Sequence, residues 1–274
     1  MSSNPTKDYG WEAQPRSFSK LLTSRSDKKP STPLPPIKVA DIKLPDTPLA
    51  KEVTSYARRE LREETFNHSM RVYYYGNTQP SVKSLLILAP STYKTFSLKQ
   101  FTNHLHLLKP TGQAIALHHF PNFSFTPETY LLLCLLHDIG TTQKNISSTH
   151  LSFEFHGALI SHSLLLSHSA PIAQAEAVAE AIIRHQDLGD SGMITTLGAI
   201  VQLATILDNA GENVELVGKE FVEEVVGAWP RKGWAACFAG TVREEIERKP
   251  WANSTRIDGF AEMVEGNEVM RPYD

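Results

Sequence analysis

The chain has 274 residues, of which 41% are hydrophobic and 21% charged, and its formal net charge at pH 7 is −3. These values are typical of a globular protein with one large domain or two small ones. There is no basic excess and no apolar run near the roughly 20 residues that cross a bilayer, so we expect neither a nucleic acid nor a membrane partner. Cys134 lies in an apolar run, where a buried reduced thiol is usual, and this fits a cytoplasmic protein.

Residues 1–45 predict a loosely held or disordered N-terminal arm. Ser, Lys and Pro dominate residues 16–40 and offer too little apolar surface to offset the entropy lost on ordering. The pattern becomes helical at Thr47, a good N-cap, which is followed by Pro48 at the first helical position. We therefore expect the folded domain to occupy residues 46–274.

Residues 77–112 interrupt this domain. They contain four Lys and no Asp, Glu or Arg, and joining Gly76 directly to Gln113 gives one continuous amphipathic stretch. We expect an insertion, with a genuine long loop as the alternative. Because closing a longer loop costs little extra entropy, residues 113–120 can repack as a separate helix. A chain without the insertion is expected to be more stable and more active.

Helical signals dominate the rest of the chain. Thr126 and Pro127 begin a strongly apolar segment that Gly140 can close in a left-handed conformation, and similar segments end at Gly189 and Gly211. No stretch shows the alternation of a convincing strand. The expected fold class is therefore all-α.

Four inward-facing groups suggest a metal site. His137 and Asp138 can converge on one point because they stand near a helix end, although a capping role for this pair is the alternative. His68 lies among apolar residues, and Asp208 ends an apolar helix, where an uncompensated carboxylate is costly. No basic residue lies within a turn of Asp208, although a distant one could reach it. Two imidazoles and two carboxylates suit Zn²⁺, with Fe²⁺ or Mn²⁺ as alternatives.

This order of groups, each on a separate helix, resembles the HD-domain metalloproteins. Further stretches resemble the fungal cyanamide hydratases over about residues 45–274: NHSMRVYYYG, CLLHDIGTT, AEAIIRHQDLG, ITTLGAIVQLATILDN, WPRKGW and RKPW. The resemblance implies a helical HD-domain bundle around a single metal site, and homo-oligomers are usual for such a fold. Two features depart from the family pattern, namely the insertion and Asn253, which stands where a histidine is expected.

The resemblance also implies an activity. Such a protein is a lyase that hydrates the nitrile of cyanamide to urea, with a metal-bound hydroxide attacking the nitrile carbon. We expect His185, on an inward helix face, to supply the proton, with core packing as the alternative. Asn67 and Thr205 are candidates to hydrogen-bond the substrate's amino group or the bound water, or they serve only in helix packing.

Two other functions remain open from the sequence. An HD-type phosphohydrolase acting on a nucleotide would need several basic groups near the metal, and only Arg71, Lys144 and Arg184 stand near the ligand motifs. An inactive HD module is the third possibility, and only the insertion favours it.

Overall fold

Two Thr-Pro pairs begin helices of the bundle as expected. Thr47 accepts a hydrogen bond from the backbone N–H of Ala50 (3.1 Å), and Thr126 accepts one from Thr129 (3.2 Å). Each threonine thereby satisfies a backbone donor that the first helical turn leaves free. Thr47 also donates to Glu128, so the two helix starts are tied to each other.

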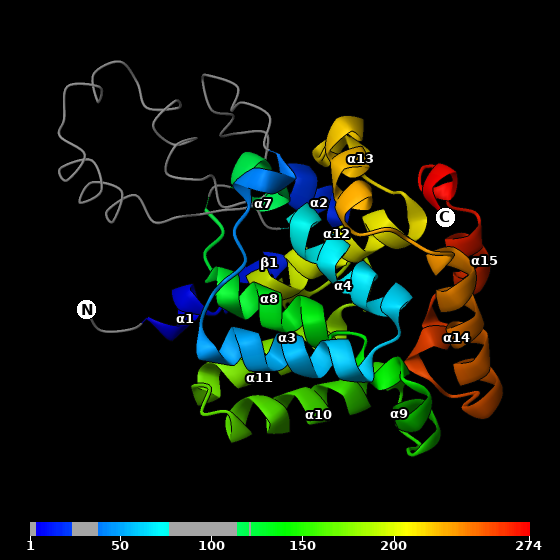
Figure 1. The fold of residues 1–274 in the computed structure, drawn as a ribbon, viewed down its shortest axis with the longest axis horizontal. Coiled ribbons are helices and arrows are strands. Elements are labelled where there is room, and N and C mark those ends of the chain that lie inside the picture. Colours follow the sequence, from blue (N-terminus) through cyan, green and yellow to red (C-terminus); the bar gives the residue numbers. More distant parts are fainter. Residues whose placement is uncertain (1–3, 24–37, 77–113, 121) are drawn as a thin grey trace.

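The computed structural model describes residues 4–23, 38–76, 114–120 and 122–274 (Figure 1). Within these ranges almost all regular structure is helical, which confirms the all-α fold class. The α-helices are α1 (Pro5–Asp8), α2 (Phe18–Thr23), α3 (Pro48–Glu60), α4 (Glu63–Gly76), α7 (Ala114–His119), α8 (Pro127–Leu136), α9 (Gln143–Ser147), α10 (Phe153–Ser167), α11 (Ile172–Arg184), α12 (Thr196–Ala210), α13 (Lys219–Ala228), α14 (Trp234–Arg248) and α15 (Phe260–Glu265). Short 3-10 turns are η2 (Val39–Asp41), η4 (Ile139–Thr141), η5 (Val214–Leu216), η6 (Asn253–Arg256) and η7 (Arg271–Tyr273).

Helices α4, α8 and α12 form the centre of the bundle. α4 packs against both α8 and α12, and α8 is also covered by α3 and α11. α8 and α12 are buried along nearly their whole length, as expected for apolar helices inside a core. α10 pairs with α11, and α14 pairs with α15 (Figure 1). Apolar residues of α14 and α15 form a second cluster around Trp234 and Phe238.

The N-terminal arm differs from the sequence prediction. In its described part, strand β1 (Ala13–Pro15) pairs antiparallel with β2 (Met193–Thr195), directly before α12. Trp11 Nε1 donates to the carbonyl of Ala173 (3.0 Å), and Leu21 is buried in the main core. Residues 4–23 are therefore docked on the domain and not loosely held.

The predicted insertion, residues 77–112, lies outside the described residues. On its two sides, α4 ends at Gly76, and α7 packs against α4 with Ile115 buried. The short separate helix expected after the insertion is thus present. Among the described helices, none is long and apolar enough to span a membrane.

Candidate metal centre

The His137–Asp138 pair lies where α8 gives way to a 3-10 turn. His137 caps α8, and Asp138 precedes η4. The turn packs closely on α10, because a Cβ at Gly140 would lie 2.0 Å from the carbonyl oxygen of Phe153. Gly140 therefore permits a close approach and does not take the left-handed conformation predicted for it, whereas Gly211 does so at the end of α12 (φ 74°).

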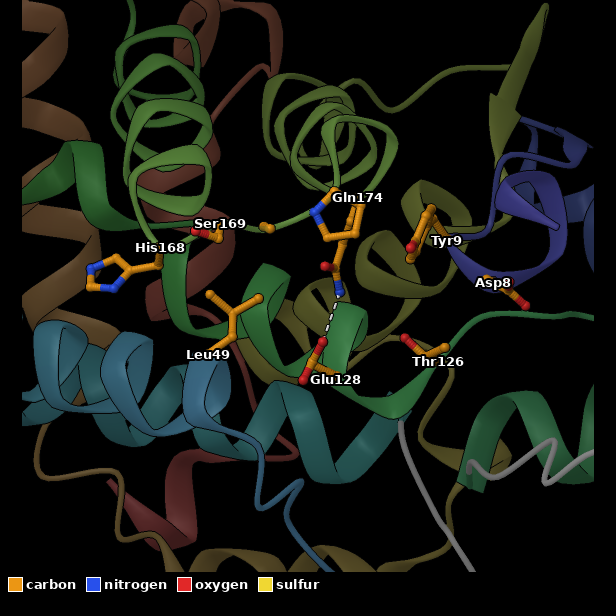
Figure 2. A pocket seen from close by; sticks show the side chains of 10 residues that line it. Asp8, Tyr9, Leu49, Thr126, Glu128, His168, Ser169 and Gln174 are labelled. Carbon is orange, nitrogen blue, oxygen red and sulfur yellow. Dashed lines mark hydrogen bonds between the residues drawn. The ribbon is translucent and has the colours of Figure 1, made fainter. Parts of the chain in front are cut away.

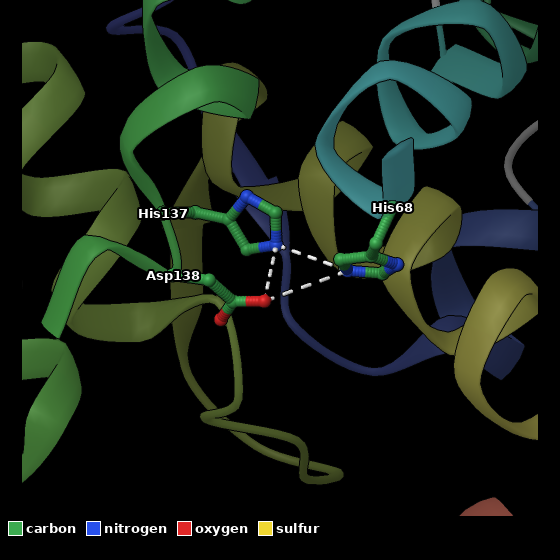
Figure 3. A group of neighbouring side chains, drawn as sticks. All are labelled: His68, His137 and Asp138. Carbon is green, nitrogen blue, oxygen red and sulfur yellow. Dashed lines mark hydrogen bonds and ion pairs between the residues drawn. The ribbon is translucent and has the colours of Figure 1, made fainter. Parts of the chain in front are cut away.

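Three buried side chains converge on one point (Figure 3). His68 Nε2 lies 3.2 Å from His137 Nε2, and Asp138 Oδ2 lies 3.3 Å from His137 Nε2 and 3.7 Å from His68 Nε2. The imidazoles come from α4 and the end of α8, the two helices that pack against each other at the centre of the bundle.

The hydrogen bonds on the outer side of each imidazole fix its tautomer. His68 Nδ1 donates to Asp208 Oδ2 (2.6 Å), and His137 Nδ1 donates to the carbonyl of Cys134 (2.8 Å). Burial lowers the pKa of both histidines to about 4, so both rings are neutral at pH 7. Each Nε2 therefore presents a lone pair to the point of convergence.

Asp138 adds carboxylate oxygens to the same point. Within the described part of the chain, neither Oδ1 nor Oδ2 accepts a hydrogen bond, and burial raises the pKa of this carboxyl. A buried cluster made only of acceptors is costly without a cation. The donor set of two imidazoles and one carboxylate fits a divalent metal with open coordination positions.

Asp208 lies outside this group of three and has other partners. Arg71 donates through Nε to Oδ1 (2.9 Å) and through Nη2 to Oδ2 (2.8 Å), and Arg231 Nη1 lies 3.1 Å from Oδ1. Although burial raises the pKa of Asp208, the two guanidiniums and His68 hold it well below its usual range. Of the two possibilities that the sequence leaves open for Asp208, distant basic partners are therefore present, and the contact of Asp208 with His68 orients that ring.

The motif WPRKGW, quoted above only for its resemblance, supports His68 and Asp208. Trp234 stacks on the His68 ring, with centroids 4.2 Å apart, and its Nε1 donates to Asn209 Oδ1 (2.8 Å). The carbonyl of Pro230 accepts from Asn67 Nδ2 (2.9 Å). The supporting roles of Arg231 and Trp234 were not predictable from the sequence, since their signal was a motif that points to no particular chemistry.

Another predicted residue, His185, lies beside the metal cluster. His185 Nε2 is 3.8 Å from Asp138 Oδ1, and it has no hydrogen-bond partner among the described residues. Together with Thr205 it lines a cavity of about 20 Å³. Asn67 is not among the residues that line this cavity in the described structure, and its amide instead ties α4 to the turn before α14.

The protonation of His185 differs from the sequence expectation. Its Nδ1 donates to the carbonyl of Ile182 (2.7 Å), and burial lowers its pKa to about 4. In the neutral ring Nε2 is then a proton acceptor. His185 can supply a proton only after it has taken one up.

Asn253, which departs from the family pattern, lies in η6. Its side-chain amide donates to Glu154 Oε1 (3.2 Å), and its backbone N–H donates to Ser152 Oγ (2.9 Å). Burial raises the pKa of Glu154 to about 7. Asn253 therefore links η6 to the first turn of α10, beside the buried carboxyl group of Glu154.

A wider hollow of about 450 Å³ opens elsewhere, between α1, α3, α8 and the turn that joins α10 to α11 (Figure 2). Gln174 Nε2 donates there to Glu128 Oε1 (3.1 Å). None of the predicted site residues lines this hollow in the described structure. The chemistry therefore concentrates at the small cavity.

Comparison with known proteins agrees with this geometry. The HD domain family matches residues 102–210, which include His137, Asp138, His185 and Asp208. Two Saccharomyces cerevisiae proteins, Cyanamide hydratase DDI2 and Cyanamide hydratase DDI3, are each 34% identical to the chain over 258 residues, which cover 93% of this chain and 95% of each relative. The chain therefore belongs to the cyanamide hydratase family of HD-domain proteins.

Proposed function

We propose that the chain is a lyase that hydrates cyanamide to urea at a divalent metal held by His68, His137 and Asp138, with zinc as the ion. Membership in the family supports the reaction, and the convergence of three buried acceptor groups supports the metal. Zn²⁺ suits this role because it binds imidazole and carboxylate together and keeps an open position for water. Fe²⁺ and Mn²⁺ suit the same donor set.

The reaction adds water across the nitrile. A C–O bond forms, one π bond between carbon and nitrogen breaks, and a proton reaches the nitrogen, which gives isourea. Isourea becomes urea when its hydroxyl proton moves to the same nitrogen, the remaining C–N π bond breaks and the C=O bond forms. When bound, the metal would lower the pKa of a water molecule and supply hydroxide near neutral pH. His185 Nε2, an acceptor at the edge of the cavity, takes the proton of the water and returns it to the nitrile nitrogen.

Thr205 would hold the amino group of cyanamide. Its hydroxyl donates to the carbonyl of Val201 (2.8 Å), so its lone pairs are the part left to meet a substrate N–H. This contact would orient the small, rigid substrate relative to His185. Asp208 would hold His68 in its metal-binding tautomer without being a fourth ligand.

The size and charge of the site do not favour a nucleotide phosphohydrolase. Because one water already needs roughly 10–15 Å³, a cavity of about 20 Å³ is far too small for a nucleotide. Arg71 and Arg231 are buried and paired with Asp208, the carboxylate that contacts His68. Lys144 is exposed on α9. Among the described residues, these basic groups are therefore not available to hold a phosphate.

The observation that carries the proposal is the cluster of His68, His137 and Asp138. The test is urea release from cyanamide by the purified chain, together with its metal content. We expect urea release with one zinc per chain, loss of activity after chelation and recovery on adding zinc. Urea release that persists in fully metal-free protein would contradict the metal role, and no release by metal-loaded protein would contradict the reaction.

We also infer a cytoplasmic homo-oligomer. Cys134 and Cys237 are both free, as is usual for a reducing compartment. Leu159 and Ile172 are exposed on α10 and α11, where a second copy could cover them. Light scattering after size-exclusion chromatography tests the oligomeric state, and a monomer at micromolar concentration would contradict it.

A further inference from the structure

Gln186 is a buried amide with unused hydrogen-bonding groups. It follows His185 at the end of α11, and its side chain is 5% exposed. Neither Oε1 nor Nε2 has a hydrogen-bond partner in the described part of the protein. Buried amide groups almost always have such partners, and leaving both ends unpaired costs free energy. A partner from outside the chain would remove that cost.

The place for such a partner is the small cavity lined by His185, whose Nε2 lies 3.8 Å from Asp138 Oδ1. Gln186 lines it together with His185, Thr205 and Asn209. Whichever way the amide is flipped, it presents one donor and one acceptor. A small molecule in this cavity therefore meets both His185 and the donor and acceptor of the Gln186 amide.

The turn that carries Gln186 is held from several directions. Asp187 pairs with Arg16 of the N-terminal arm (2.9 Å) and with Arg184 (3.1 Å), and it also contacts Arg256 of η6. Gln202 Nε2 donates to the carbonyl of Arg184 (2.7 Å). These contacts limit the movement of the turn, so the unpaired amide is a fixed feature of the cavity wall.

We propose that Gln186 determines substrate specificity by accepting a hydrogen bond from the amino group of cyanamide. The inference rests on the proposed function. Cyanamide offers what the amide lacks, namely amino hydrogens for its acceptor and a nitrile lone pair for its donor. Acetonitrile has the same three-atom chain with a methyl group in place of the amino group, and it leaves the acceptor of Gln186 buried and unpaired. A site built around a polar group rejects an analogue that cannot bond to it.

The test uses Gln186→Met, which keeps the length of the side chain and removes both polar ends. We measure kcat/KM for cyanamide, and either acetonitrile hydration or its inhibition constant against cyanamide. The variant should lose about 10- to 100-fold in kcat/KM for cyanamide. Its affinity for acetonitrile should stay within roughly threefold of the wild-type value or improve. The preference for cyanamide over acetonitrile should therefore decrease. Metal content should be that of the wild type, and Tm should be equal or higher, because the variant has no unpaired buried amide.

Gln174→Met is the matched control. Gln174 is a buried amide at the other end of α11, where it donates to Glu128 (3.1 Å) and Thr129 (3.0 Å). This variant should lose stability and keep the preference for cyanamide. If Gln186→Met does not fold, Gln186→Ala replaces it under the same expectation.

The possible results separate the two proposals. A wild-type chain that releases urea, combined with an unchanged preference in the Gln186 variant, overturns this inference alone. An equal loss for cyanamide and acetonitrile also overturns it, because the residue would then only support the fold. If the metal-loaded wild type releases no urea, the proposed function fails and this inference fails with it.

Discussion

The carboxylate of Asp208 joins two buried guanidiniums to one metal-facing imidazole. Arg71 comes from α4, and Arg231 comes from the turn before α14. The hydrogen bond from His68 Nδ1 to the same carboxylate fixes the tautomer of His68. A buried ion pair adds little stability by itself, but removing one partner leaves the other charges uncompensated. One residue thus couples the charge balance of the core to the orientation of a proposed ligand.

Asp208→Asn should therefore destabilise the fold and weaken metal binding. Because Arg71 loses its carboxylate partner and Arg231 keeps only Asp274, we expect a loss of about 3–5 kcal/mol in the free energy of unfolding. Thermal unfolding and metal analysis measure the two effects. Asp274→Asn is the control, since Asp274 pairs with Arg231 (2.9 Å) at a less buried position, and its effect should be far smaller. Equal losses in the two variants would contradict this role for Asp208.

His185 gives a kinetic prediction at the same scale. His185→Asn should keep the fold and the metal and lower kcat by about 100-fold or more, because the reaction loses its proton carrier. Urea release under saturating cyanamide measures this effect. His168→Asn, at an exposed histidine of the wider hollow, should leave kcat unchanged. If His185→Asn retains full turnover, the histidine serves only in packing.

At the scale of elements, the contact between α10 and η6 contains a carboxyl group with a strongly raised pKa. Glu154 is fully buried, and burial raises its pKa from 4.5 to about 7, while Asn253 bonds to one of its oxygens. The folded state therefore holds this proton more tightly than the unfolded state does. The resulting stabilisation is present below the ordinary pKa of Glu and is lost as the pH rises through about 7.

Glu154→Gln should remove this pH dependence. At pH 8 the variant should be more stable than the wild type by about 1–3 kcal/mol, and at pH 5 the gain should be much smaller. Tm measured at both pH values, with equal metal content, checks this. Glu245→Gln serves as the contrast, because Glu245 accepts from the N–H of Phe153 (2.7 Å) and from Ser254 (2.5 Å), and its replacement should destabilise at both values. A uniform gain for Glu154→Gln across the pH range would contradict the assignment.

Elements were predictable from sequence where their causes are local. The N-caps at Thr47 and Thr126 bond to residues three positions on, and both helices begin where expected. Partners distant in sequence were not predictable. Arg231 follows α13 in the sequence and contacts Asp208 in α12, which precedes α13. Neither hydrophobic periodicity nor composition predicts such a contact. Gln186 was missed for a related reason, since a buried amide without partners is visible only in three dimensions.

At the scale of the whole molecule, the predicted insertion separates α4 from α7 in the sequence. α4 carries His68, and α7 packs against α4, so each flank has its own contacts with the core. A chain that lacks residues 77–112 should keep its metal content and show a higher Tm and faster urea release, because less chain is constrained between the two helices. Differential scanning calorimetry and the urea assay compare the two chains. If deletion lowers both Tm and activity, the segment is a genuine part of the fold.

The small sheet determines when the N-terminal segment can dock during folding. β1 joins β2, and Gln14 donates to Thr196 Oγ1 across 182 positions of sequence. During synthesis the N-terminal segment leaves the ribosome long before its partner strand exists, so it cannot dock until most of the chain has emerged. Arg16 reaches Asp187 only then, and Asp187 is next to Gln186. The N-terminal segment thus fixes the turn beside the cavity only after residues 187–196 have been made. Because Ile257 and Phe260 also line the cavity, a nascent chain should acquire its substrate preference only near the end of synthesis.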